Sequence, residues 1–223
     1  MDEMTGSERK RVAVLISGRG SNMQALIDAA QAPDYPASIA LVVSNVPDAP
    51  GLDRAEAAGI PTEVVDHTQF VGRPAFEAAL TEVLGEADIE FVCLAGFMRV
   101  LTGYFVDLWP DRVLNIHPSL LPAFPGLRTH AQALAAGVKF SGCTVHFVRE
   151  TLDGGPVIGQ AAVPVHQGDT SRSLAARVLK AEHRLYPHCL ELVAAGRVRV
   201  VGYTTEIDGV EPPHRTLINP APG

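Results

Sequence analysis

The chain has 223 residues, of which 47% are apolar and 19% charged, a composition typical of a folded globular protein rather than a disordered one. It carries 18 Lys and Arg against 25 Asp and Glu, and the formal net charge of −7 disfavours duplex DNA or RNA as the main partner. No apolar run approaches the ~18 residues of a membrane-spanning helix. The N-terminus is polar, without the apolar stretch of a signal peptide, and the three cysteines are widely spaced. We therefore expect a cytoplasmic protein with reduced, buried thiols.

The first part of the chain alternates between strand-like and helix-like patterns. Apolar strands are predicted at 11–17, 39–44, 60–65, 89–96 and 112–117. Amphipathic helices are predicted around 23–30 and at 51–59, 73–86 and 129–137. Two pairs, Ser21 with Gln24 and Thr129 with Gln132, have the spacing of a capping box at a helix start. This alternation predicts a mostly parallel sheet covered by helices, hence a three-layer α/β fold with a Rossmann-like N-terminal half.

The pattern changes after residue 139. Strands at 140–148 and 157–165, joined by a turn that contains Asp153, predict an antiparallel hairpin added to the sheet. A long helix is predicted at 173–196, and Pro187 should kink or interrupt it. We expect a flexible N-terminus at 1–10, one domain at 11–203, and an extended proline-rich tail at 204–223.

The glycine-rich turn SGRGSNMQ (17–24) follows the first strand. Gly18 and Gly20 fit the start of the dinucleotide-binding pattern G-x-G-x-x-G, but Met23 occupies the third glycine position. The second strand ends without an acidic residue to bind a ribose, so a dinucleotide is disfavoured. Free N–H groups at the start of the following helix still suit a phosphate. An ordinary tight turn that binds nothing explains the same residues, and both interpretations stay open.

Asn115 and His117 lie two residues apart at the carboxyl end of a predicted parallel strand. Side chains with this spacing point to the same face, and ligand sites in open α/β sheets lie outside the carboxyl ends of the strands. An amide donor and a titratable imidazole are therefore placed together where chemistry is usual. A hydrogen-bonded core histidine beside a strand-capping asparagine is the structural alternative, and for an isolated pair it is favoured.

Asp153 changes this balance if it lies near His117. A carboxylate there favours the charged imidazole and raises its pKa, which makes the histidine a general acid at neutral pH. The asparagine amide would then stabilise a developing oxyanion. A turn aspartate with no role beyond the turn is the alternative, and the sequence does not show whether residues 36 positions apart meet.

Several motifs occur in order between about Arg11 and Val200: VLISGRGSN, VCLAGFMRVL, LNIHPSLLPAFPGLRTH, VHFV, LDGGPVI and AEHRLYP. In this combination the chain closely resembles the folate-dependent glycinamide ribonucleotide formyltransferases. Those enzymes have a single domain around a mostly parallel sheet, in agreement with the pattern above. The chain departs from them only in the first ten residues and the proline-rich tail.

The resemblance assigns expected roles to particular residues. It implies catalysis by Asn115, His117 and Asp153, ribonucleotide binding by Gly20, Ser21, Asn22 and Glu182, and folate binding by Arg73, Met98, Arg99, Val100, Leu101 and Asn115. Without it, Arg73 and Glu182 would be interpreted as solvated helix charges, and the three apolar residues among the folate set as core. The co-substrate implied is 10-formyltetrahydrofolate, and no metal constellation is expected.

The activity implied is formyl transfer from 10-formyltetrahydrofolate to the amine of glycinamide ribonucleotide, by a monomer or homodimer with no nucleic-acid or membrane partner. Formyltetrahydrofolate hydrolase and methionyl-tRNA formyltransferase use similar catalytic domains, but each carries a further domain, and we expect no room for one in this chain. A phosphate- or folate-binding protein without catalysis is the alternative of another class. It would not need Asn115, His117 and Asp153 together.

Overall fold

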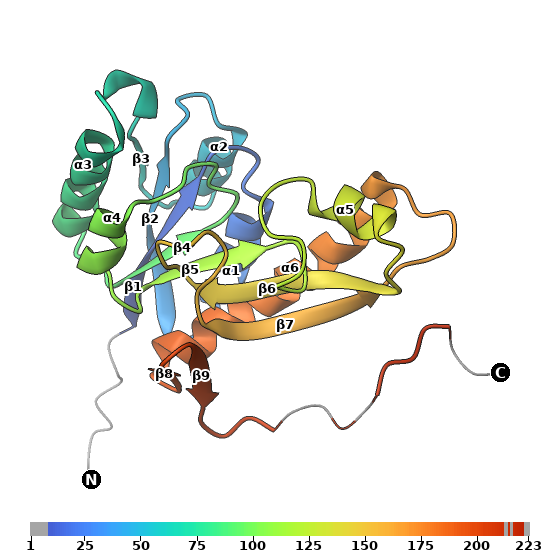
Figure 1. Ribbon diagram of the computed structural model, residues 1–223. Helices are drawn as coiled ribbons and strands as arrows, with labels where there is room; N and C mark the ends of the chain where they lie inside the picture. The colour runs from blue at the N-terminus through green and yellow to red at the C-terminus, as the bar shows by residue number, and fades with distance from the viewer. Residues whose placement is uncertain (1–8, 212–213, 215, 221–223) are drawn as a thin grey trace, which may run out of the picture.

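The computed structural model describes residues 9–211, 214 and 216–220. Seven strands form one sheet in the order β3-β2-β1-β4-β5-β6-β7 (Figure 1). The strands are β1 (Lys10–Ile16), β2 (Ala37–Ser44), β3 (Thr62–Val64), β4 (Phe91–Leu94), β5 (Val113–His117), β6 (Phe140–Phe147) and β7 (Val157–Pro164). The helices are α1 (Ser21–Ala30), α2 (Pro50–Ala57), α3 (Arg73–Glu86), α4 (Gly103–Leu108), α5 (Thr129–Ala135) and α6 (Ser171–Ala194), with a short 3-10 helix at His67–Gln69.

The first five strands pair in parallel, whereas β6 and β7 are antiparallel additions. Alternate side chains of strand β1 enter two separate hydrophobic cores, one on each face of the sheet. Ala13 and Leu15 pack with α3 and α4, whereas Val14 and Ile16 pack with α1, α2 and α6. Figure 1 shows these helices on the two faces of the sheet. The predicted three-layer α/β fold and its antiparallel hairpin are therefore confirmed.

The antiparallel hairpin fixes what lies opposite the carboxyl half of β5. Asn115 pairs with His146 of β6, and His117 pairs with Thr144. The connection between β6 and β7 bends back over the sheet. Gly155 makes this possible, because a Cβ there would lie 1.8 Å from the Phe147 carbonyl oxygen. The register of β6 against β5 therefore sets which residues lie opposite Asn115 and His117.

Both predicted capping boxes are wrong. Helix α1 begins after Gly20 and α5 after Arg128, and both of these N-cap residues adopt the left-handed conformation without a side-chain cap. Ser21 and Thr129 are already inside their helices, so their hydroxyls are one position too late to cap. A capping box does occur at the start of α6, between Thr170 and Ser173.

Helix α6 runs through Pro187 without interruption, contrary to the prediction of a break. The buried Tyr35 hydroxyl donates a 2.7 Å hydrogen bond to the Pro187 carbonyl. The helix packs on α1, β6 and β7 along its length, and this tertiary packing overrides the local cost of the proline.

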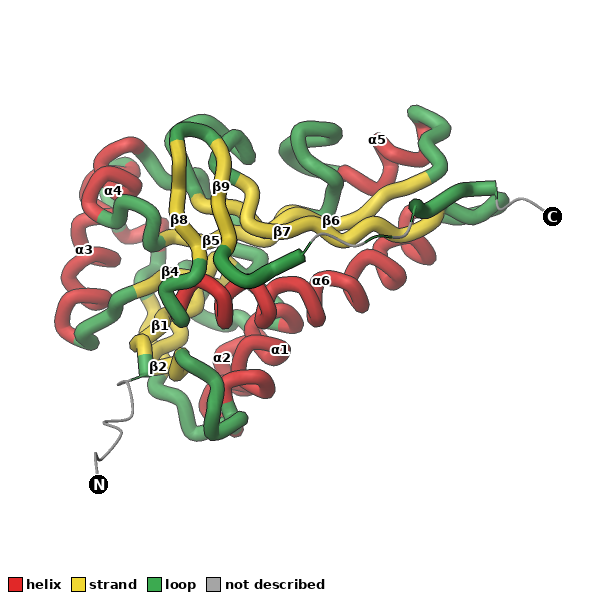
Figure 2. The backbone as a smooth tube through the Cα atoms, turned by 90° about the horizontal axis from the view of Figure 1, so that it is seen from below, coloured by secondary structure: helices red, strands yellow, loops and turns green. Residues whose placement is uncertain are grey.

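The predicted tail starts too early, because residues at its beginning form a strand. β8 (Val198–Val201) and β9 (Thr204–Ile207) make a separate antiparallel hairpin. The Thr205 hydroxyl donates to the Val157 carbonyl of β7, and Figure 2 shows this hairpin beside the main sheet. The predicted flexible N-terminus lies almost wholly outside the described residues.

The three cysteines are free and buried, as predicted from their apolar neighbours. Among the described residues, none of the helices has the length and apolar character to cross a membrane.

Candidate active site

A cavity of about 590 Å³ opens at the carboxyl ends of β4 and β5. This volume is in the range of pockets that hold drug-sized ligands. Its lining includes the three proposed catalytic residues Asn115, His117 and Asp153, and also the four predicted folate residues of the segment 98–101. The sequence places these groups far apart, and the fold brings them to one cavity.

His117 and Asp153 meet inside this cavity. His117 Nδ1 lies 3.5 Å from Asp153 Oδ1, and both side chains are 7% exposed. The other ring nitrogen, Nε2, donates a 3.0 Å hydrogen bond to the Phe124 carbonyl oxygen. Because both ring nitrogens face oxygen acceptors, the surroundings suit an imidazolium that holds two protons. Asp153 is itself fixed, since its Oδ2 accepts the Gly126 N–H at 2.8 Å.

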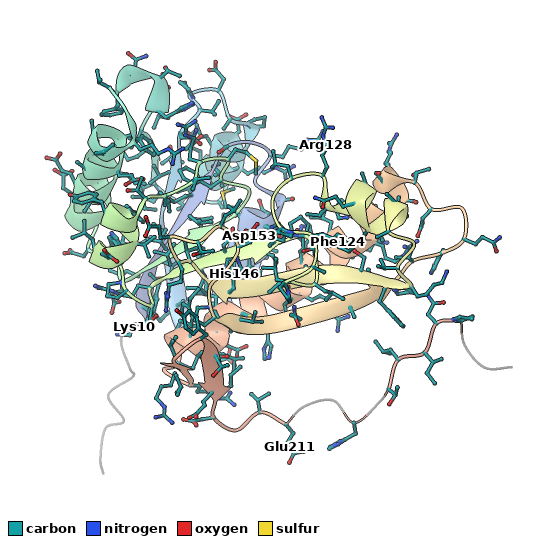
Figure 3. All side chains as sticks on the ribbon, in the orientation of Figure 1. Lys10, Phe124, Arg128, His146, Asp153 and Glu211 are labelled. Atoms are coloured by element: carbon teal, nitrogen blue, oxygen red, sulfur yellow. The ribbon has the colours of Figure 1, made fainter. Side chains whose placement is uncertain are left out.

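The backbone is strained where the loops converge on the site. Phe124, Arg128 and Asp153 all have positive φ angles, between 53° and 57°. Figure 3 places Phe124 and Asp153 beside the end of the β5–β6 pair, with Arg128 pointing away from them. Non-glycine residues in this conformation cluster at functional sites, where the surrounding structure holds them in place.

Asn115 is oriented by His146, a residue that the sequence did not single out. His146 Nδ1 donates to the Phe147 carbonyl at 3.0 Å, so its Nε2 is the acceptor nitrogen of the neutral ring. Asn115 Nδ2 lies 3.2 Å from this Nε2 and donates to it. Burial lowers the pKa of His146, which keeps the ring neutral and this pattern intact. The second N–H of the Asn115 amide then remains available to a ligand.

The glycine-rich turn is packed against the start of α2. Gly20 has φ 68°, and a Cβ there would lie 2.9 Å from Met23 Cε. Gly51 of α2 donates its N–H to the Gly18 carbonyl at 2.9 Å, and a Cβ at Gly51 would lie 2.8 Å from that same oxygen. Next to this contact, the first turn of α1 has backbone N–H groups that no side chain caps.

Asn22 and Glu182 join α1 to α6 beside this turn. Asn22 Nδ2 donates a 2.7 Å hydrogen bond to Glu182 Oε2, and Asn22 Oδ1 is buried without a partner. Burial raises the pKa of Glu182, against the opposing effects of the Asn22 hydrogen bond and of nearby His117. Asn22 and Glu182, two of the predicted ribonucleotide residues, are thus linked to each other.

The predicted folate residues fall into two groups. Met98, Arg99, Val100 and Leu101 line the cavity, with Leu101 buried and Met98 65% exposed. Arg73 stands exposed at the first turn of α3, outside the cavity lining. The structure therefore does not bring Arg73 together with the other folate residues.

Two histidines of the cavity were missed from the sequence. His146 was hidden because its role depends on the strand register opposite Asn115. His130, on α5, lines the cavity with a buried Nδ1 that has no partner, and burial lowers its pKa. Both histidines occur in motifs that carry the family resemblance, His146 in VHFV and His130 at the end of LNIHPSLLPAFPGLRTH. These motifs were the signal from which the two residues could have been found. Across the described part of the chain, no group of three or more His, Cys, Asp or Glu could hold a metal ion.

Residues 10–190 match the formyl transferase family. The chain belongs to this family. It is 46% identical to a phosphoribosylglycinamide formyltransferase of Escherichia coli (strain K12), over 89% of this chain and 93% of that protein. It is 54% identical to the trifunctional purine biosynthetic protein adenosine-3 of Bos taurus over 86% of this chain, but it spans only 19% of the bovine protein.

A solved structure of the family supports the same relation. Glycinamide ribonucleotide transformylase 1 from Symbiobacterium toebii is 46% identical and superposes with a TM-score of 0.90. The match covers 93% of this chain and 98% of that one. The two chains therefore share their fold over nearly the whole of this chain.

Proposed function

We propose that the chain transfers the formyl group of 10-formyltetrahydrofolate to the amine of glycinamide ribonucleotide, a step of purine biosynthesis. The observation that carries this proposal is the set of Asn115, His117 and Asp153 on one cavity wall, with His117 Nδ1 3.5 Å from the carboxylate. A protein that only bound phosphate or folate would have no need of this set. The names of the similar proteins support the same substrates.

In the proposed reaction, the amine nitrogen of the ribonucleotide attacks the formyl carbon directly. A tetrahedral intermediate forms, and the free N–H of Asn115 and a ring N–H of His117 donate to its oxyanion. His117 Nε2 already binds a carbonyl oxygen, that of Phe124, and the formyl oxygen would replace this acceptor. Holding the two substrates together supplies much of the remaining acceleration.

Collapse of the intermediate breaks the bond between the formyl carbon and N10 of the folate. The attacking amine loses a proton and N10 gains one, so the overall transfer is balanced. Asp153, whose Oδ1 lies 3.5 Å from His117 Nδ1, takes part in this proton relay, with water. One C–N bond forms and one breaks with no change of oxidation state, so neither an oxidant nor a covalent formyl-enzyme is required.

The two substrates would occupy opposite sides of the catalytic residues. The folate lies along the segment 98–101, which lines the cavity with three apolar side chains and Arg99. The ribonucleotide phosphate lies at the start of α1, on Gly20, Ser21 and Asn22, and Glu182 holds the glycinamide amine. Arg73 would contact the folate only from outside the cavity. We infer a cytoplasmic monomer or homodimer that acts on small molecules, in keeping with three free buried thiols and a charge of −7.

A formyl-transfer assay tests this function. The purified chain is mixed with 10-formyltetrahydrofolate, with and without glycinamide ribonucleotide, and tetrahydrofolate and formylated ribonucleotide are measured. We expect both products in equal amounts, and only when the acceptor is present. Tetrahydrofolate with free formate in the absence of acceptor would contradict the proposal and assign the chain to the hydrolases. If neither mixture gave product, the result would contradict the proposal and favour the alternative of a phosphate- or folate-binding protein without catalysis.

A further inference from the structure

The segment from β4 to α4, Phe97–Thr102, forms the folate wall of the cavity, and we refer to it as the wall loop. Two of its side chains are anchored in the core, since Phe97 is 9% and Leu101 4% exposed, whereas Met98 is 65% and Val100 46% exposed. Backbone contacts add to these anchors in fixing the shape of the loop. One is at the start of the loop, where Met98 N–H donates to Ser17 Oγ at 2.7 Å.

The other backbone contact is made by Glu77 of α3. Glu77 Oε1 accepts the Thr102 N–H at 2.8 Å, and Oε2 accepts a short hydrogen bond from the Thr102 hydroxyl. Thr102 is the N-cap of α4, yet its side chain makes no cap hydrogen bond to that helix. Its hydroxyl is committed to Glu77 instead. Both oxygens of one carboxyl group therefore hold the end of the wall loop.

Burying the carboxyl group of Glu77 costs free energy. Glu77 is 1% exposed, and among the described residues it forms no ion pair with a Lys, Arg or His side chain. A buried carboxyl group without a cation costs free energy that an apolar side chain would not, so stability alone does not account for it. Its two hydrogen bonds both end on Thr102, which points to positioning of the wall loop.

Helix α3 also holds the other end of this loop. Phe76, next to Glu77 in the sequence, stacks on Phe97 with ring centroids 6.4 Å apart. Phe97 and Thr102 are thus both fixed by consecutive residues of α3. Of the four cavity-lining residues between them, Leu101 is buried, whereas the side chains of Met98 and Val100 are exposed.

We propose that Glu77 is a positioning residue for the folate site, which acts through Thr102 without touching the substrate. This inference rests on the proposed function, because it names how the folate wall of that site is held. If Thr102 is released, the wall loop gains conformations that do not fit the folate, whereas the ribonucleotide side, at the start of α1, is unaffected.

Steady-state kinetics of three variants test this role. Glu77→Ala should raise the KM for 10-formyltetrahydrofolate about tenfold, equivalent to about 1.4 kcal/mol, and leave the KM for the ribonucleotide within about twofold. Glu77→Gln should restore most of the folate affinity, because its amide oxygen accepts the Thr102 N–H and its NH2 group donates to the Thr102 hydroxyl. Leu84→Ala is the matched control, since Leu84 is a fully buried residue of the same helix whose apolar side chain cannot form a hydrogen bond with Thr102. It should lower the melting temperature and leave both KM values unchanged.

The proposal is overturned if folded Glu77→Ala keeps the wild-type folate KM, if it raises both KM values equally, or if Leu84→Ala has the same folate effect. If Glu77→Ala does not fold, Thr102→Val decides, because it removes only the hydroxyl contact and should raise the folate KM about threefold. Calorimetric binding of tetrahydrofolate provides a readout that needs no turnover. If the wild-type chain transfers no formyl group, the proposed function fails, while this binding series still tests Glu77.

Discussion

The proposed catalytic residues and the wall loop are held in different ways. Asn115, His117 and Asp153, together with His146, which orients Asn115, are held by side-chain contacts to each other or to nearby backbone, and three of the four side chains are at least nine-tenths buried. The wall loop exposes Met98 and Val100, and it is held by backbone hydrogen bonds together with the buried Phe97 and Leu101 side chains. The proposed catalytic geometry therefore depends on strand register, whereas the wall loop depends on a few anchors near its two ends. The following variants test this difference.

Asn115→Ala should have the largest effect. It removes one oxyanion donor, and the loss of such a donor lowers kcat by about 10²–10³. The Kd for tetrahydrofolate should change little, because most of the folate contacts lie on the wall loop. Stopped-flow kinetics and calorimetry measure the two quantities. An unchanged kcat would remove Asn115 from the chemistry.

Asp153→Asn should lower kcat by about 10²-fold, within the range of general acid–base contributions. The amide keeps the shape and an acceptor for the Gly126 N–H, but it removes the negative charge that faces His117. Stopped-flow kinetics measure kcat, and circular dichroism shows whether the variant is folded. A folded variant with the wild-type kcat would remove Asp153 from the proposed proton relay.

Met98→Ala should have a smaller effect of a different kind. Removing an apolar side chain from the wall loop should raise the folate KM about three- to fivefold with kcat retained, since each buried CH2 contributes about 0.8 kcal/mol. Val71→Ala is the control, because Val71 is 98% exposed and lies outside the cavity lining. If kcat falls with Met98→Ala, the division between wall and catalytic residues is wrong.

Glu182→Gln should change stability in a pH-dependent way. Burial raises the pKa of Glu182, so the folded protein favours the neutral carboxyl group. Wild-type stability is therefore lost as the pH rises from the ordinary range of Glu through the raised pKa of the folded state. The variant, which cannot ionise, should melt at an increasingly higher temperature than wild type over this range. In a chain of this size, 1 kcal/mol corresponds to about 2–4 °C, which calorimetry resolves. A difference independent of pH would contradict the assignment of cause.

The strands and layers were predictable because their apolar runs are continuous, and α3 was predicted with its observed bounds, 73–86. The helix starts were less predictable. At Gly20 and Arg128 the chain enters a helix from a left-handed residue, a conformation set by tertiary contacts rather than by local spacing. Pro187 likewise does not interrupt α6, because the tertiary packing of this helix overrides the local preference of proline.

The site was predictable in part. The two-residue spacing placed Asn115 and His117 on one face, and the structure has both in the cavity lining. The approach of Asp153 depends on how the β6–β7 connection folds back, and the role of His146 depends on strand register. Neither is encoded within a short window. The sequence singled out Asp153 without showing that it meets His117, and it presented His146 only as part of the motif VHFV.

The tight packing of Gly51 affects how loss-of-function variants are interpreted. Gly51 lies about thirty residues after the glycine-rich turn, and a Cβ there would stand 2.5 Å from Ile16 Cδ1 as well as close to the Gly18 carbonyl. Any side chain at position 51 must therefore push the turn away from α2. In a random mutagenesis screen, substitutions of Gly51 would be scored with those of the phosphate turn, although this residue needs no contact with the ligand. The residues identified in such a screen would thus include one of helix α2, although α2 is not proposed to contact the ligand.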